Sequence, residues 1–131
     1  MGHWLHHCAD YPYAYVVLIH ALAMAGSTLY DVIGIVPHDV CAVAVDCRAH
    51  RLSDAETKSF ATTQFADDIV AVLDDVGRDL AVIAEWSMGG CWPRALASDH
   101  PDRTAELVLI DTLAWVDRMS ARRGRHGQTP P

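Results

Sequence analysis

The stretch LAVIAEWSMGG, residues 80–90, decides how the rest of the chain is interpreted. Its first five residues are all apolar, as in a parallel strand that is covered on both faces. Ser87 follows this strand, and Met88 and two glycines follow Ser87. This order predicts a tight strand-to-helix turn that pushes the serine hydroxyl clear of the backbone, with the free N–H groups of a helix beginning beside it.

A nucleophilic serine on such a turn usually lies in a GxSxG pattern, because the residues two before and two after it approach each other closely. Gly89 meets this requirement, but Glu85 stands where the first glycine is expected. The alternative interpretation is that Ser87 only caps a helix that begins near Met88. The choice between a nucleophile and a helix cap therefore depends on the rest of the chain.

Three further apolar stretches are typical of strands, at residues 13–19 (YAYVVLI), 40–45 (VCAVAV) and 107–110 (LVLI). Helical spacing and stop signals predict helices between the strands, at about residues 27–33, 62–76 and 88–98. Ser27 is expected to cap the first helix, Pro37 to stop it, and Gly77 to end the second. The predicted fold class is α/β, a mostly parallel sheet of about four strands in three αβα layers, with helices on both faces.

This core is expected to occupy residues 13–116, between a polar segment at 1–12 and a basic, disordered tail at 117–131. All strands of a parallel sheet end at one rim, and ligands of open α/β sheets bind there. The rim of this sheet would gather polar groups from four segments: residues 20–23, 46–53, 85–87 and Asp111.

Charge and composition exclude several classes of partner and cofactor. A net charge of −7 and a pI near 5.4 argue against nucleic acid and anionic membranes. No secretory signal or bilayer-spanning run is evident, so a cytoplasmic location is expected. Nothing in the sequence calls for an organic cofactor or a metal. The histidines at positions 3, 6 and 7, beside Cys8, could bind a transition metal, but they lack a scaffold that would orient them. The four cysteines have no CxxC spacing and are expected to be reduced.

Five segments in the same order and spacing resemble the α/β-hydrolase family, over residues 15–115. They are VLIHALAMAGS, similar to a strand with HGxG; DCRAHRLSD, similar to DxRGxGxSD; FADDIVAVLDDVG, the helix before the elbow; EWSMGG, similar to GxSMGG; and HPDRTAELVLIDT, similar to HPxRVxxLVLxDT. The resemblance implies a small esterase or lactonase of the enol-lactonase or carboxylic-ester type. It also implies a serine hydrolase with Ser87 as nucleophile, and an oxyanion hole made by the backbone N–H groups of Met88 and Leu22.

The departures from the family pattern are as informative as the matches. Ala21, Ala49 and Arg51 replace glycines, the last two at positions where glycine often supplies a positive φ. Glu85 puts a carboxylate beside the turn, where desolvation is costly. Pro93 is expected to kink the helix after the elbow.

The resemblance also implies that the chain is truncated at both ends, so that the triad acid and histidine of the family are not evident. Asp111 is a conceivable acid, because some relatives place the acid after this strand. His126 would be the base, as the only histidine downstream, and His50 is an outside candidate. Without flanking strands, residues 40–45 and 107–110 would be exposed sheet edges that favour self-association.

Two functions follow from these observations. The first is hydrolysis of a small-molecule ester or lactone through Ser87. The second is a catalytically incompetent, truncated or degenerate hydrolase domain that serves at most as a binding module. Dinucleotide binding is excluded, because the loop HALAMAG lacks the GxGxxG that a pyrophosphate requires.

Overall fold

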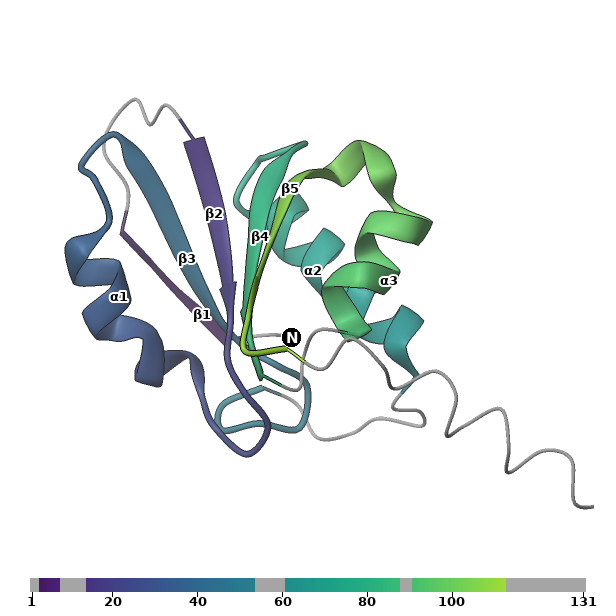
Figure 1. The fold of residues 1–131 in the computed structure, drawn as a ribbon, viewed down its shortest axis with the longest axis horizontal. Helices are drawn as coiled ribbons and strands as arrows, with labels where there is room; N and C mark the ends of the chain where they lie inside the picture. Colours follow the sequence, from purple (N-terminus) through teal and green to yellow (C-terminus); the bar gives the residue numbers. More distant parts are fainter. Residues whose placement is uncertain (1–2, 8–13, 54–60, 88–90, 113–131) are drawn as a thin grey trace, which may run out of the picture.

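The computed structural model describes residues 3–7, 14–53, 61–87 and 91–112, and shows one sheet with strand order β1-β3-β2-β4-β5 (Figure 1). The four predicted strands are β2 (Ala14–Ile19), β3 (Val40–Asp46), β4 (Ala81–Trp86) and β5 (Thr104–Ile110). Each of them runs parallel to its neighbours in this group. The predicted α/β fold with a mostly parallel sheet is confirmed.

A fifth strand, β1 (His3–His7), was not predicted from the sequence, because HWLHH has no alternation of apolar and polar residues. It pairs antiparallel with β3, with His3 opposite Asp46 and His7 opposite Ala42. The expectation that residues 40–45 form an exposed sheet edge is therefore wrong. At the other side of the sheet, β5 pairs with β4 and has no further strand beside it in the described part of the chain.

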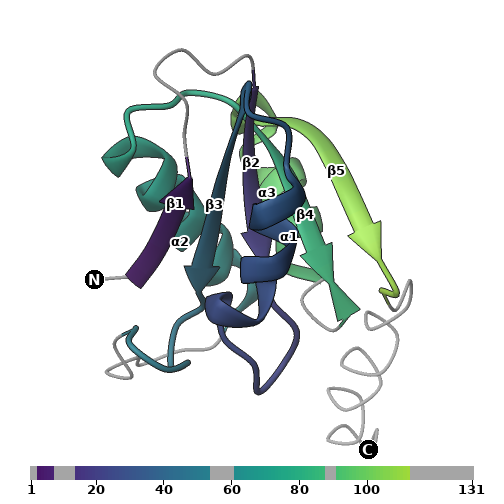
Figure 2. The ribbon, with the colours of Figure 1, turned by 90° about the vertical axis from the view of Figure 1, so that its left-hand side faces the viewer.

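Helices cover both faces of the sheet (Figures 1 and 2). On one face lie a short 3₁₀ turn, η1 (Gly26–Leu29), and α1 (Tyr30–Ile35), which pack on small and aliphatic residues of β2, β3 and β4. On the other face lie α2 (Thr62–Asp75) and α3 (Cys91–Asp99). Phe65 of α2 stacks on Trp92 of α3 with ring centroids 3.9 Å apart, so the two helices share the larger core.

The ends of the helices follow some of the predicted local signals and depart from others. Gly77 has a φ of 69° after α2, as predicted, and the N–H of Arg78 donates to the carbonyl of Leu73 at 2.8 Å, which closes the helix end. The expectation that Ser27 caps the first helix is wrong. Ser27 lies inside η1, and no side chain caps that turn. Pro93 is the third residue of α3. The N–H groups of the first helical turn make no hydrogen bond within a helix, so a proline at this position breaks none, and the predicted kink has no cause.

Cys41 lies on β3 and Cys47 directly follows it, and the two differ in oxidation state. Cys41 is disulfide-bonded, so the expectation that all four cysteines are reduced is wrong. Cys47 is free and buried.

No helix in the described ranges is long and apolar enough to cross a membrane.

Candidate active site

Ser87 directly follows β4 and is partly exposed, and its φ is 71°. A residue other than glycine rarely adopts this left-handed conformation, which crowds its own Cβ, and such strain often occurs at functional sites. The helix α3 begins four residues later, at Cys91. Ser87 thus lies on a sharp turn between a strand and a helix, as predicted, whereas Met88 and Gly89 lie outside the described residues.

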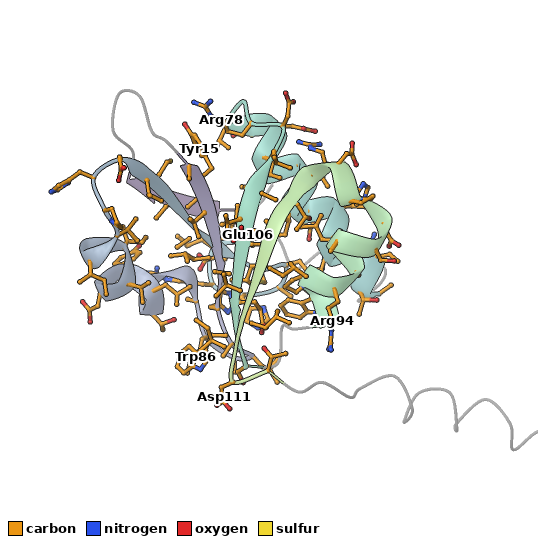
Figure 3. All side chains as sticks on the ribbon, turned by 45° about the horizontal axis from the view of Figure 1, so that its top comes forward. Tyr15, Arg78, Trp86, Arg94, Glu106 and Asp111 are labelled. Carbon is orange, nitrogen blue, oxygen red and sulfur yellow. The ribbon has the colours of Figure 1, made fainter. Side chains whose placement is uncertain are left out.

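Asp111 occupies the equivalent place on the neighbouring strand. Ile110 is the register partner of Trp86, so Asp111 and Ser87 are the next positions along two strands whose backbones run about 5 Å apart. Figure 3 shows Asp111 and Trp86 at the same end of the sheet. Asp111 also has a positive φ, 51°, and it is exposed. His126, the proposed base, lies outside the described residues.

Glu85 has an environment unlike that of an exposed catalytic group. It is only 1% exposed and lies on the same side of β4 as Ile83, toward α2 and α3. Its Oε2 atom accepts a hydrogen bond from the Thr112 hydroxyl at 2.5 Å. The hydroxyl stabilises a carboxylate that would otherwise be costly to bury, and it ties the end of β4 to the end of β5.

The loop after β2 carries the expected oxyanion-hole donor. Because Ile19 pairs with Glu85, this loop leaves the sheet beside the Ser87 turn. Leu22 is exposed, and its N–H makes no hydrogen bond to any atom in the described ranges. The next residue, Ala23, has a φ of 59°, and the N–H of Met24 donates to the carbonyl of Ala21 at 3.1 Å. The loop is therefore a tight turn in which the Leu22 N–H has no acceptor among the described residues.

Three hydrogen bonds, each from a backbone N–H to a side-chain acceptor, join this loop to the end of β3 and to the loop after it. Asp46 Oδ1 accepts from the N–H of Gly26 at 2.7 Å. His20 Nε2 accepts from the N–H of Cys47 at 3.1 Å. His50 Nε2 accepts from the N–H of Ala23 at 3.3 Å. These three contacts, called here the loop clamp, join the loop that carries Leu22 to β3 and to the loop that follows it.

Both histidines of the loop clamp are neutral acceptors with both ring nitrogens engaged. His20 Nδ1 lies 2.8 Å from the carbonyl of Ala21, and His50 Nδ1 lies 3.0 Å from the carbonyl of Arg48. A carbonyl can only accept, so each Nδ1 carries the proton and each Nε2 is free to accept. Burial lowers the pKa of His20, which favours its neutral form. Each Nε2 atom therefore already accepts a backbone N–H within the loop clamp.

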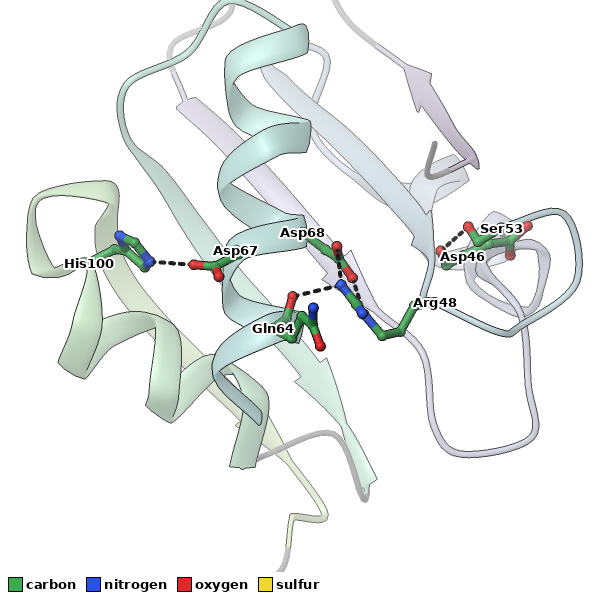
Figure 4. A network of polar contacts seen from close by, with 7 residues as sticks. All are labelled: Asp46, Arg48, Ser53, Gln64, Asp67, Asp68 and His100. Carbon is green, nitrogen blue, oxygen red and sulfur yellow. Dashed lines mark hydrogen bonds and ion pairs between the residues drawn. The ribbon is translucent and has the colours of Figure 1, made fainter. Parts of the chain in front are cut away.

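The remaining polar groups of the second loop fasten it to α2 (Figure 4). Arg48 makes a bidentate ion pair with Asp68, at 2.7 and 2.6 Å, and donates to the carbonyl of Gln64. The Ser53 hydroxyl donates to the carbonyl of Asp46. Planar, bidentate pairing of this kind fixes orientation as well as charge. These residues hold the loop against α2 and β3.

The two glycine replacements in this loop take the conformation that glycine would supply. Ala49 has a φ of 59° and Arg51 a φ of 46°. The expectation that this loop requires positive φ is confirmed, and the chain accepts the strain with other residues.

The other histidines with described side chains lie elsewhere. His38 precedes β3, at the end of the sheet opposite to Ser87. His100 Nε2 contacts Asp67 of α2 at 3.1 Å, as Figure 4 shows. Within the described ranges, no three or more His, Cys, Asp and Glu side chains gather into a group that could hold a metal ion.

Sequence reasoning missed two contacts at this rim. The bond from Ala23 to His50 joins residues 27 apart, and so does the bond from Thr112 to Glu85. The only available signal was the placement of both segments at the ends of neighbouring strands, which indicates proximity but no partner.

Comparison with known proteins agrees with this geometry. A family model described as alpha/beta hydrolase fold matches residues 15–128. The chain belongs to this family. Its structure superposes on the enol-lactonase from Burkholderia xenovorans LB400 with a TM-score of 0.77 at 23% identity, covering 95% of this chain and 51% of the other. It superposes on a thermophilic esterase from Thermogutta terrifontis with a TM-score of 0.78 at 21% identity, covering 96% and 49%.

A sequence relative is the 2-(acetamidomethylene)succinate hydrolase of Mesorhizobium japonicum, 29% identical over 75 residues, which are 57% of this chain and 27% of that protein. The chain therefore spans about a quarter of this relative and about half of the two solved structures. The family match assigns the chain to the α/β-hydrolase family, and the two solved structures agree with its fold.

Proposed function

We propose that the chain hydrolyses a small-molecule ester or lactone, with Ser87 as the nucleophile. The observation that carries the proposal is the φ of 71° at Ser87, a serine between β4 and α3 of an α/β-hydrolase fold. A serine that merely caps a helix adopts extended backbone angles, so helix capping does not account for this strain.

The proposed reaction follows from the groups around Ser87. The Oγ atom attacks the carbonyl carbon while its proton passes to a general base, and the carbonyl oxygen becomes an oxyanion held by the N–H groups of Leu22 and Met88. Collapse of this intermediate expels the alkoxide, which takes the proton from the base, and leaves an acyl-serine. Water activated by the same base then releases the acid.

The proposed reaction requires a general base and a carboxylate that orients it. His126 is the proposed base and Asp111 the proposed acid, and no cofactor takes part. Asp111 is supported by its place beside Ser87 in the strand register. Enol-lactones and carboxylic esters are the proposed substrate class, by analogy with the names of the two solved neighbours.

A second candidate function has its own support. The chain could be a catalytically incompetent hydrolase domain that serves at most as a binding module. Glu85 is a buried carboxylate two residues before the nucleophile, and both histidines near the rim have their ring nitrogens engaged by the backbone. Without a base, a serine at its ordinary pKa is a poor nucleophile.

Hydrolysis of p-nitrophenyl acetate and of a simple γ-lactone distinguishes the two functions. The proposal predicts turnover by the wild-type chain that is lost in Ser87→Ala and retained in Ser98→Ala, a control at an exposed serine of α3. If the chain gives a folded circular dichroism spectrum but no turnover above buffer, the incompetent domain is the better account.

A further inference from the structure

His50 lies in the loop after β3, yet its ring reaches the loop after β2. It accepts a hydrogen bond from Ala23, the residue that follows the proposed oxyanion-hole donor Leu22. We propose that His50 is a positioning residue whose neutral ring fixes the turn at residues 21–24, and thereby the direction of the Leu22 N–H, and that protonation of the ring releases the turn. The catalytic part of this inference rests on the proposed function.

The turn needs an external support because its backbone is strained. Ala23 has a φ of 59°, which an L-residue adopts only where the surroundings enforce it. Within the turn, the N–H of Met24 donates to Ala21. The only hydrogen bond from Ala23 N–H in the described part of the chain goes to His50. Loss of this acceptor would remove the contact that holds Ala23 in place.

The ring can act as a support because it is fixed on its other side. His50 Nδ1 donates to the carbonyl of Arg48 at 3.0 Å. Arg48 is itself held by its bidentate pair with Asp68 and by the carbonyl of Gln64. The contacts run from α2 through Arg48 and His50 to Ala23, so the position of the turn is set by the core helix.

Protonation reverses the role of Nε2. The neutral ring offers a lone pair to Ala23 N–H, whereas the imidazolium carries a proton on both nitrogens. Nε2–H and Ala23 N–H would then be two donors facing each other across 3.3 Å, and the hydrogen bond cannot persist. Histidine is the side chain that changes charge near neutral pH, so this loss is accessible under mild conditions.

Several titratable and charged groups surround the His50 ring. The His20 ring lies 4.9 Å from the His50 ring, centroid to centroid. Burial lowers the pKa of His20, as does the charge of His50. Asp46 lies near the histidine pair, Arg48 is occupied by Asp68, and Arg51 is exposed on the same loop. Burial therefore keeps the His20 ring neutral beside His50.

Nuclear magnetic resonance of the full chain tests the inference directly. Amide signals of Leu22 and Ala23 and the ring signals of His50 are followed from pH 8 to pH 5. We expect the two amides to shift along the same titration curve as the His50 ring, and the hydrogen exchange of Ala23, corrected for its intrinsic pH dependence, to accelerate at least tenfold on protonation.

Two variants separate the hydrogen bond from the bulk of the ring. His50→Gln keeps an acceptor near the position of Nε2 but cannot titrate, so its amides should stay near the neutral wild-type positions over the whole pH range. His50→Phe keeps a ring against His20 but has no acceptor, so Ala23 should exchange at least tenfold faster at pH 8. The inference is overturned if the His50 ring titrates without moving Ala23, or if both variants leave Ala23 unchanged.

Labelling of Ser87 by a fluorophosphonate distinguishes this inference from the proposed function. If Ser87 is labelled, the labelling rates of the wild-type chain and of His50→Gln are compared at each pH. The ratio of the wild-type rate to the His50→Gln rate should fall as His50 is protonated. If the amides titrate as expected but Ser87 is never labelled, the proposed function fails and the positioning of the turn by His50 stands. If Ser87 is labelled and the amides do not follow His50, the inference alone fails.

Discussion

Replacing Asp46 by alanine tests whether the loop clamp stabilises the rim of the sheet. Asp46 is 5% exposed, and its Oδ1 atom accepts from Gly26 N–H at 2.7 Å. Asp46→Ala leaves this N–H buried without an acceptor.

The expected cost follows from the kind of bond that is lost. A hydrogen bond to a charged group contributes about 1.5–3 kcal/mol, and an unpaired buried N–H costs a similar amount, so a loss of about 2 kcal/mol in the free energy of unfolding is expected for Asp46→Ala. Single domains are stable by about 5–15 kcal/mol, so this loss is measurable and should lower the melting temperature by roughly 8 °C. Asp46→Asn retains an acceptor and should lose about half as much.

Urea unfolding followed by tryptophan fluorescence gives the free energies, and hydrogen exchange at Gly26 locates the effect. Asp46→Ala should speed exchange of the Gly26 amide more than Asp46→Asn does. The reasoning is refuted if the two variants are equally stable within about 0.5 kcal/mol, or if the exchange of Gly26 is the same in both.

Three further predictions concern Cys47, His20 and β5. Burial, the largest cause, raises the pKa of the Cys47 thiol to about 12, so roughly one molecule in ten thousand carries the thiolate at pH 8. Iodoacetamide should therefore alkylate Cys47 only after unfolding, and rapid alkylation of the native chain would contradict this. Burial lowers the pKa of His20 from 6.5 in the folded chain, so His20 binds a proton more readily in the unfolded chain. The free energy of unfolding should therefore decrease as the pH falls below about 6.5. An equal pH dependence in His20→Gln would argue against this role of His20. Val108 of β5 is 41% exposed, beside a sheet edge that has no further strand in the described part of the chain. Val108→Lys should therefore reduce self-association measured by light scattering, whereas Ile35→Lys, at an exposed position of α1, should not. Equal scattering from the two variants would rule out self-association through the β5 edge.

The sequence was sufficient for features that depend on local chemistry. Continuous apolar runs identified β2, β3 and β4, because a strand buried on both faces needs apolar side chains at nearly every position. The run LVLI also marked β5, although most side chains of this edge strand are exposed. Gly77 marked the end of α2 for a purely local reason, the left-handed conformation of its backbone. The position of Ser87 on a sharp turn follows from the same kind of signal.

Features that depend on distant partners were not accessible. The strand β1 forms because β3 offers an unpaired edge, and no pattern within HWLHH reports this. The kink expected at Pro93 depended on where α3 begins, and a shift of three residues removed its cause. The contact of His50 with Ala23 arises because two loops leave neighbouring strands at the same rim.

The central claim, that Ser87 is an activated nucleophile, is tested most directly by intact mass spectrometry after treatment with a fluorophosphonate. The reagent bonds to a serine Oγ only where a base accepts its proton and an oxyanion hole stabilises the phosphoryl oxygen. We predict a single adduct on the wild-type chain and on Ser98→Ala, and no adduct on Ser87→Ala. A native-like, compact charge-state distribution without an adduct on the wild-type chain would contradict the claim.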